Sequence, residues 1–240
     1  MTWLWRICFS LAALPVLAGT VTGRVELIAS RDPAVRKARD FSGVVVWLES
    51  LTTRGDGAEN AGPPRDVTMD QRDKSFQPHV LAIQVGTAVN FTNSDPIFNN
   101  AFSNFDGQIF DIGLYPPGTS RRVLFRRPGI VRVFCNIHPM MSAVIVVLRT
   151  PWFAITDAAG HFRIEGVPSG EYRLKMFHER ALASTLDQLE QRVTVGAGSA
   201  ALPLLQVSES GWVPAPHSNK YGKDYPSAVD DHIVYPGAKR

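Results

Sequence analysis

The part of this chain best suited to chemistry is the nine-residue stretch 134–142, which reads FCNIHPMMS. A thiol at Cys135, an imidazole at His138 and a thioether at Met141 follow one another at intervals of three. These are soft or borderline ligands, and together they favour copper. Zinc fits less well, because a thioether is a poor zinc ligand and the motif holds no second cysteine. The spacing therefore predicts a copper-type loop.

The number of cysteines strengthens the case for Cys135 as a metal ligand. Cys8, the other cysteine, lies in a segment that begins with one charge, at Arg6, and continues as a short apolar run. That run is too short to span a bilayer and predicts a signal peptide over residues 1–18. The mature protein is then periplasmic, has no membrane span and keeps Cys135 as its single thiol. Metal ligation would explain an exported single thiol, and burial as a small hydrophobic residue is the alternative.

The segments around the loop read as strands. Val131, Val133 and Cys135 fall on one face by alternation, and 144–148 is apolar throughout. Short alternating runs separated by Gly and Pro turns recur along the chain, which predicts an all-β fold. The best helix candidate covers 181–191, and the proline-containing residues 208–240 indicate an extended or disordered tail.

This loop resembles a known family. The pattern Cys-x₂-His-x₂-Met before a valine-rich strand is similar to the ligand loop of amicyanin and related plastocyanin-like proteins. Residues 86–95, GTAVNFTNSD, also resemble a strand and turn of the same family. The resemblance covers about 69–149 and extends to domains often labelled methylamine-utilisation proteins. It implies a cupredoxin-like Greek-key β-sandwich over 52–150 that binds copper and passes electrons to a redox protein partner.

One position departs from the family pattern. The family supplies its first histidine ligand in a His-Asn pair, and this chain has Asn99-Asn100 there. Asn99 is therefore a doubtful ligand, whereas Asn100 matches the residue that braces the ligand loop. Three interpretations follow from this. In the first, copper still binds and the site is completed by Asn99, by water or by another histidine. In the second, a partner protein supplies the missing ligand, and in the third the domain has lost its metal.

A second resemblance follows the loop. Residues 156–164, TDAAGHFRI, and 167–174, VPSGEYRL, resemble the carboxypeptidase-regulatory-like fold, a small Ig- or prealbumin-like β-sandwich without catalytic residues. Pieces that match the start of that fold lie far upstream, within 19–51. The resemblance predicts a discontinuous sandwich of 19–51 and 151–207 with 52–150 inserted. The alternative is that 19–51 adds strands to the cupredoxin-like sandwich.

The charge and the motifs of the sequence exclude several classes of function. The formal net charge is +3 and no nucleic-acid motif is present, so no nucleic-acid partner is expected. We find no nucleophile–base pairing and no phosphate-binding loop, and we expect a protein that is not an enzyme. The leading expectation is copper binding with electron transfer. The alternatives are a copper carrier and a metal-free interaction or scaffold module of an exported oxidoreductase system. We expect His217 and His232, in the tail, to stay away from a metal.

Overall fold

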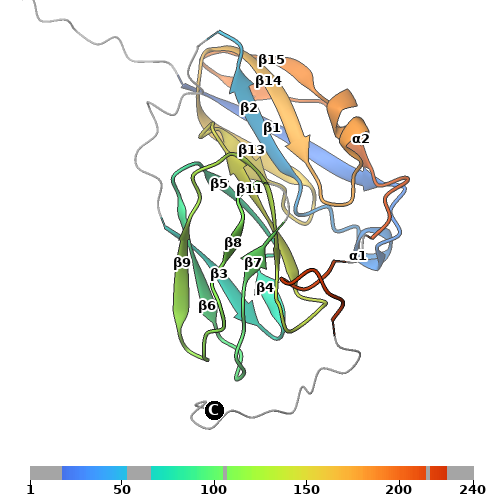
Figure 1. Cartoon of the computed structure of the whole chain (residues 1–240). Coiled ribbons are helices and arrows are strands. Elements are labelled where there is room, and N and C mark those ends of the chain that lie inside the picture. Colours follow the sequence, from blue (N-terminus) through green and yellow to red (C-terminus); the bar gives the residue numbers. More distant parts are fainter. Residues whose placement is uncertain (1–17, 53–65, 105–106, 215–216, 226–240) are drawn as a thin grey trace, which may run out of the picture.

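The computed structural model describes residues 18–52, 66–104, 107–214 and 217–225. Four β-sheets dominate this part of the chain (Figure 1), and the prediction of an all-β fold is confirmed. The expected signal peptide lies almost wholly outside the described residues. Within the described residues, no helix has the length and apolar character needed to cross a membrane. Two short helices are present, α1 (Pro33–Ala38) and α2 (Ala183–Gln188).

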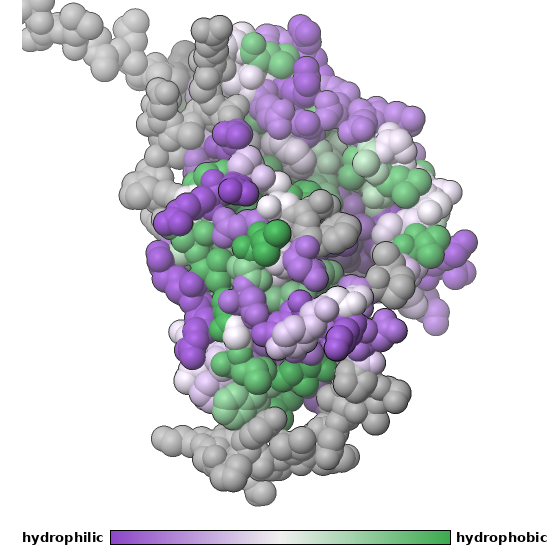
Figure 2. Space-filling model, viewed as in Figure 1, coloured by the Kyte–Doolittle hydropathy of each residue, from purple (hydrophilic) through white to green (hydrophobic). Residues whose placement is uncertain are grey.

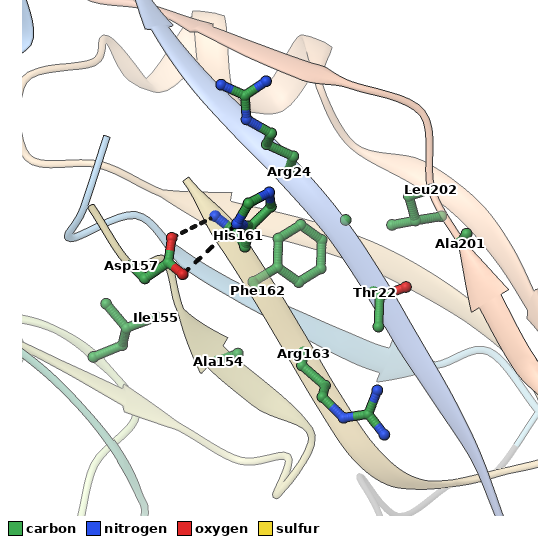
Figure 3. Close-up of a pocket in the computed structure, with 11 residues that line it drawn as sticks. Thr22, Arg24, Ala154, Ile155, Asp157, His161, Phe162, Arg163, Ala201 and Leu202 are labelled. Carbon is green, nitrogen blue, oxygen red and sulfur yellow. Dashed lines mark hydrogen bonds and ion pairs between the residues drawn. The ribbon is translucent and has the colours of Figure 1, made fainter. Parts of the chain in front are cut away.

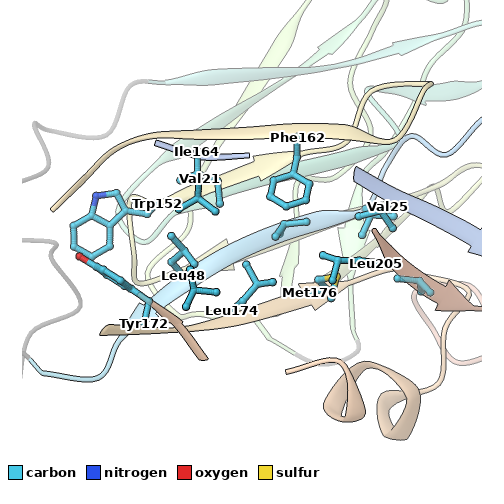
Figure 4. Packing of buried hydrophobic residues seen from close by; sticks show 14 of the residues in the cluster. Val21, Val25, Leu48, Trp152, Phe162, Ile164, Tyr172, Leu174, Met176 and Leu205 are labelled. Carbon is cyan, nitrogen blue, oxygen red and sulfur yellow. The ribbon is translucent and has the colours of Figure 1, made fainter. Parts of the chain in front are cut away.

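The first and last parts of the described chain form two sheets. In one sheet the order is β13-β1-β16, with β17 also paired to β1, and in the other it is β12-β2-β14-β15. Their facing sides share one hydrophobic core (Figure 4). The strands are β1 (Ala18–Ile28), β2 (Val45–Ser50), β12 (Phe153–Ile155), β13 (His161–Pro168), β14 (Gly170–Phe177), β15 (Gln191–Val195), β16 (Ser199–Ala201) and β17 (Leu205–Ser208).

Strand β2 belongs to this pair of sheets. It runs antiparallel to β14, from Ser50 opposite Tyr172 to Val45 opposite Phe177, and it also pairs with β12. The side chains that β2 turns inward meet those of β14 in the core, where Leu48 and Leu174 lie close together in Figure 4. Strands from before and after residues 67–148 are thus hydrogen-bonded to each other.

The middle of the chain forms the other two sheets. Their strand orders are β5-β11-β10-β7-β8 and β4-β3-β6-β9, and a second core that includes Cys135 and Met141 lies between them. The strands are β3 (Val67–Arg72), β4 (Ser75–Gln77), β5 (Val80–Gln84), β6 (Ala88–Asn93), β7 (Phe102–Ser103), β8 (Phe110–Asp111), β9 (Ser120–Leu124), β10 (Gly129–Phe134) and β11 (Ser142–Leu148).

A third hydrophobic cluster joins the two halves. Along β11, Val144 and Val146 belong to this cluster, whereas Ile145 and Val147 belong to the core that holds Cys135. On β2, Val45 faces the same junction. Both faces of β2 and β11 are therefore buried, which explains why the two strands are apolar without alternation.

A histidine–carboxylate pair also crosses this junction. His79, between β4 and β5, lies with Nε2 2.8 Å from Glu179 Oε2, and its Nδ1 is 3.0 Å from the Ser142 carbonyl oxygen. The hydrogen bond to Glu179 raises the pKa of His79, although burial opposes it. Burial works to raise the pKa of Glu179, but His79 and Arg180 together hold it below its usual value.

This pair predicts a pH-dependent stability. Because the folded-state pKa of His79 is raised, its stabilisation is complete below about pH 6.5 and is lost as pH rises through the folded pKa. The His79 side chain is 47 % exposed, so we expect a loss of only about 0.5–1 kcal/mol. Urea unfolding at pH 6 and pH 8 measures this difference. His79→Gln should remove it, and His161→Gln, at another exposed histidine, should not. An unchanged difference in His79→Gln would show that His79 does not cause this pH dependence.

Candidate metal centre

The residues of the predicted copper loop lie together in one connection. Cys135 follows β10, and its N–H donates to the Met141 carbonyl oxygen at 3.2 Å. The Met141 N–H donates in turn to the His138 carbonyl oxygen at 3.1 Å, which closes a tight loop before β11. Cys135 is 0 %, Met141 1 % and His138 6 % exposed. All three side chains are therefore withdrawn from water.

The thiol and the imidazole of this loop are in contact. Cys135 Sγ lies 3.7 Å from His138 Nδ1. Two ligands bonded to one ion at about 2.0 and 2.3 Å, with an angle near tetrahedral or trigonal, are about 3.5–3.7 Å apart. The separation therefore suits a shared metal ion. It equally suits a thiol that donates a weak hydrogen bond to the ring.

The surroundings of the thiol act on it in opposite directions. Burial raises the pKa of Cys135, while backbone hydrogen bonds from Ile137, His138 and Asn100 lower it, and burial prevails. The metal-free side chain is thus a neutral thiol at neutral pH. Three backbone donors nevertheless point at the sulfur, and they would stabilise the negative charge of a thiolate. A metal that binds here would displace the proton.

Asn99 precedes Asn100, whose backbone contacts Cys135, and it is fully buried with one side-chain atom that has no partner among the described residues. Its Nδ2 donates to Asn93 Oδ1 at 3.0 Å and to Asp95 Oδ2 at 2.9 Å. Its Oδ1 accepts no hydrogen bond from any residue that the structure describes. The reverse amide orientation would place this oxygen against two acceptors, so the assignment is well determined. A buried, unpaired carbonyl costs about 1–3 kcal/mol. A buried oxygen donor is therefore left without a partner at Asn99.

Asn100 links the ligand loop to the neighbouring strands. Its Oδ1 accepts from the Asn136 N–H at 3.2 Å, inside the loop. Its Nδ2 donates to Asp111 Oδ1 at 2.8 Å and to the Gly113 carbonyl oxygen at 3.0 Å. Together with its backbone contact to Cys135, this makes Asn100 the residue that ties the loop to β8 and the turn after it.

The kinds of atoms that the loop and Asn99 could offer indicate which metal they would suit. Among the described residues, no three His, Cys, Asp or Glu side chains gather in a way that could hold a metal ion. A site at this loop would therefore depend on the Met141 thioether and the Asn99 oxygen as well as on Cys135 and His138. Thiolate, imidazole and thioether suit copper, and the unpaired oxygen of Asn99 is the one hard donor among them. These residues fit a copper ion with one weak ligand.

Other residues around the loop were not predicted from the sequence. Tyr115 pairs with Asn99 through two backbone hydrogen bonds, and its hydroxyl donates to Gln71 Oε1. Burial, with Cys135 nearby, raises the pKa of Tyr115. His217 and Tyr225 contact the loop from the C-terminal side. No motif marked these residues, because each is brought to the loop by folding alone.

A pocket on the other half of the molecule is a weaker candidate. It opens beside β1 and β13 and contains Arg24, His161 and Arg163 (Figure 3). Each of these side chains already has an acidic neighbour. Arg24 pairs with Glu26 at 3.1 Å, Arg163 with Glu165 at 2.5 Å, and His161 lies 3.8 Å from Asp157. The pocket therefore offers no unpaired cluster of charge for chemistry.

Exposed apolar side chains occur on the half that contains the loop. Met140 is 90 % exposed, although Met141 next to it is buried, and Ile109 and Leu114 are also exposed. Figure 2 shows hydrophobic side chains at the surface of this half, whereas hydrophilic ones dominate over β14 and β15. The neighbouring methionines thus provide a matched pair for mutagenesis, one inside the site and one outside it.

Comparisons with known proteins give partial matches. The chain is 37 % identical over 62 residues to the methylamine utilization protein MauL of Methylorubrum extorquens, which covers 25 % of this chain and 54 % of MauL. The chain thus spans about half the length of this curated relative. No family model matches the sequence.

Several solved structures are similar to part of the chain. A purple cupredoxin from Nitrosopumilus maritimus is 23 % identical, with a TM-score of 0.32 over 35 % of this chain and all of that one. A Cu(I) amicyanin variant is 17 % identical, with a TM-score of 0.33 over 43 % of this chain and 98 % of that one. A copper-containing nitrite reductase from Thermus scotoductus is 26 % identical, with a TM-score of 0.34 over 52 % of this chain and 28 % of that one.

Proposed function

We propose that this protein is a periplasmic, cupredoxin-like copper protein that carries electrons and is not itself an enzyme. The observation that carries the proposal is the contact of Cys135 Sγ with His138 Nδ1 at 3.7 Å, beneath three backbone donors. Copper would supply a one-electron couple at this loop. The similarity to the methylamine utilization protein MauL supports a part in methylamine utilisation, where we expect a redox protein as partner.

The residues of the loop would each have a distinct part. Cys135 would hold the ion as a thiolate, whose charge the N–H groups of Ile137, His138 and Asn100 would stabilise. Met141 would supply a buried thioether sulfur as a soft ligand. Asn99 presents an amide oxygen where the family has an imidazole. An amide oxygen is a weaker donor for copper than an imidazole, and the soft thiolate and thioether of this loop would then favour Cu(I) over Cu(II).

The domain organisation is part of the proposal. We infer that 52–150 is a cupredoxin-like domain inserted into a carboxypeptidase-regulatory-like sandwich made of 19–51 and 151–207. The support is the pairing of β2 with β12 and β14, together with the separate core that these strands share. Residues 1–18 would be the signal peptide that sends the protein to the periplasm.

A metal-free interaction module is the second candidate. It is favoured by the same thiol–imidazole contact, since a neutral thiol can donate to the ring without any metal. In that case the buried loop is a structural element and the protein acts as a scaffold for its redox system. Direct copper binding separates the two candidates.

A copper titration with matched methionine variants tests the function. We expect Cu(I) to bind the native protein in competition with a chelator, and Cys135→Ser to weaken binding by more than about 100-fold, because the thiolate is the strongest donor. Met141→Leu should weaken binding by about tenfold, since a soft ligand is lost. Met140→Leu, at the 90 % exposed neighbour, should match the native protein. Native protein that binds no copper would leave the interaction module as the function.

A further inference from the structure

Nine residues near the C-terminus, 217–225, lie on the outside of the ligand loop (red in Figure 1). The His217 ring stacks on Phe134, the residue before Cys135, with 4.0 Å between ring centroids and 24° between planes. His217 Nε2 is 2.8 Å from the Pro139 carbonyl oxygen. His217 therefore contacts both the end of β10 and the middle of the loop.

Tyr225 adds a second contact at the cysteine itself. Its hydroxyl donates to the Cys135 carbonyl oxygen at 2.8 Å and lies 3.3 Å from His217 Nδ1. The two rings meet nearly at right angles, with 5.3 Å between centroids. Both aromatic side chains therefore hold backbone oxygens of the loop and also support each other.

Lys220 adds a third contact, which reaches Asn100. Its backbone N–H donates to Asn136 Oδ1 at 3.0 Å, and its Nζ lies 2.7 Å from Asp111 Oδ2. The other oxygen of Asp111 accepts from Asn100 Nδ2. The segment is thus connected to the residue that braces the loop as well as to the loop.

The contacts that hold residues 217–225 against the loop would allow this segment to detach from it. Its contacts with the loop are made by side chains and single backbone groups, and none of its described residues is in a strand. Its own turn is closed locally, because Asn219 Oδ1 accepts from the N–H groups of Tyr221 and Lys223 at 2.9 and 3.1 Å. A unit with local structure and few tethers can detach without opening the sandwich.

We propose that residues 217–225 form a self-docked cover over the Cys135–Met141 loop, and that a metal donor or partner protein reaches this loop only when the cover has moved away. His217 and Tyr225 are positioning residues in this device, since they hold the carbonyl oxygens of Pro139 and Cys135 rather than a metal. The proposal deepens the proposed function, but the cover itself is a property of the metal-free protein. It can therefore be tested without copper.

The alkylation rate of Cys135 measures how often the cover opens. Metal-free protein is treated with iodoacetamide, and mass spectrometry of the peptide that contains Cys135 distinguishes it from Cys8. We expect slow modification in the native protein. Tyr225→Phe should react about tenfold faster, and His217→Ala combined with Tyr225→Phe about 100-fold faster, because each removes a tether of the cover. The rate of copper release to a chelator should rise in the same order.

Tyr221→Phe is the matched control. Tyr221 is in the same segment and is 69 % exposed, and its ring lies against Lys220 rather than against the loop. This variant should be modified at the native rate. If the double variant unfolds, Lys220→Gln provides a milder test, with modification a few-fold faster.

Two results would contradict the proposed cover, and a third would contradict only the proposed copper function. Equal rates in Tyr225→Phe, Tyr221→Phe and native protein would overturn it, as would fast alkylation of the native thiol. Faster alkylation of the tether variants without copper binding would leave the cover in place and contradict only the copper function.

Discussion

Asn99→His should convert this protein into one that binds Cu(II) with intense visible absorption. The substitution places an imidazole at the buried position where Asn99 Oδ1 has no partner among the described residues. Imidazole suits copper far better than an amide oxygen, and His₂Cys with a weak Met is the blue-copper arrangement. We expect Cu(II) affinity to rise by about 100-fold or more.

The new histidine also has a partner to orient it. Asn99 Nδ2 now donates to Asn93 and Asp95, and one ring N–H of a histidine could make one of these bonds and leave the other nitrogen free to bind a copper ion. Such an outer hydrogen bond fixes the ring and raises its basicity. The position is therefore suited to a ligand histidine beyond its place in the sequence.

Visible absorption and EPR after Cu(II) addition measure this effect. Asn99→Gln keeps the amide and serves as the control, which should stay colourless. Adding Cys135→Ser to Asn99→His should abolish the colour, because the absorption arises from the thiolate. A folded Asn99→His protein that binds Cu(II) without intense absorption would mean that position 99 and Cys135 do not share a metal site.

Glu209→Gln should cause the largest loss of stability. Glu209 Oε1 lies 2.9 Å from His178 Nε2 and 3.1 Å from Arg180 Nε, and its Oε2 accepts from Ser30 Oγ at 2.5 Å. The side chains of Glu209 and His178 are each only 3 % exposed. Loss of one partner from a buried charged group costs about 3–5 kcal/mol. We expect about 3 kcal/mol, because Arg180 keeps Asp32 and Glu179.

The pH dependence of this effect has a defined sign. Burial works to raise the pKa of Glu209, but the hydrogen bonds from His178 and Ser30 and the charge of Arg180 hold it below its usual value. The stabilisation is therefore present above the ordinary glutamate pKa, near 4.3, and is lost as pH falls through the folded pKa. The difference between native protein and Glu209→Gln should shrink below about pH 4.

Urea unfolding at pH 7 and at acid pH measures both points. Glu165→Gln is the control, since the Glu165 side chain is 68 % exposed in its pair with Arg163. It should change the free energy of unfolding by less than about 1 kcal/mol. A Glu209→Gln protein as stable as this control would mean that the buried network contributes little to the sandwich.

The metal loop could be read from the sequence because its residues are close together in the chain. Cys135, His138 and Met141 lie within one hairpin connection, so their spacing nearly fixes their proximity. Asn99 and Asn100 were found only through a family pattern, because they precede β7 and reach the loop by strand pairing. Period-two patterns likewise gave the all-β class.

The two short helices were predicted less accurately from the local sequence pattern than the strands were. The helix expected over 181–191 is α2, shortened to Ala183–Gln188, and it has no buried residue to define one face. We did not predict α1, although Asp32 caps it and Pro33 begins it. A single Asp-Pro start is a common turn signal as well, so a six-residue helix does not stand out from a loop.

The sequence by itself determined that this is a β protein with three soft or borderline ligand types, Cys135, His138 and Met141, in one short loop. Tertiary structure alone decided what covers that loop. Tyr225 bonds to Cys135 across 90 residues, and its segment has no hydrophobic period that would mark a docking face. Tertiary structure likewise decided the neighbours of β2 and β11. Their apolar runs indicate that both faces of each strand are buried, but they do not indicate which elements pack against those faces. Burial is encoded locally, whereas the choice of neighbour depends on how the whole chain packs.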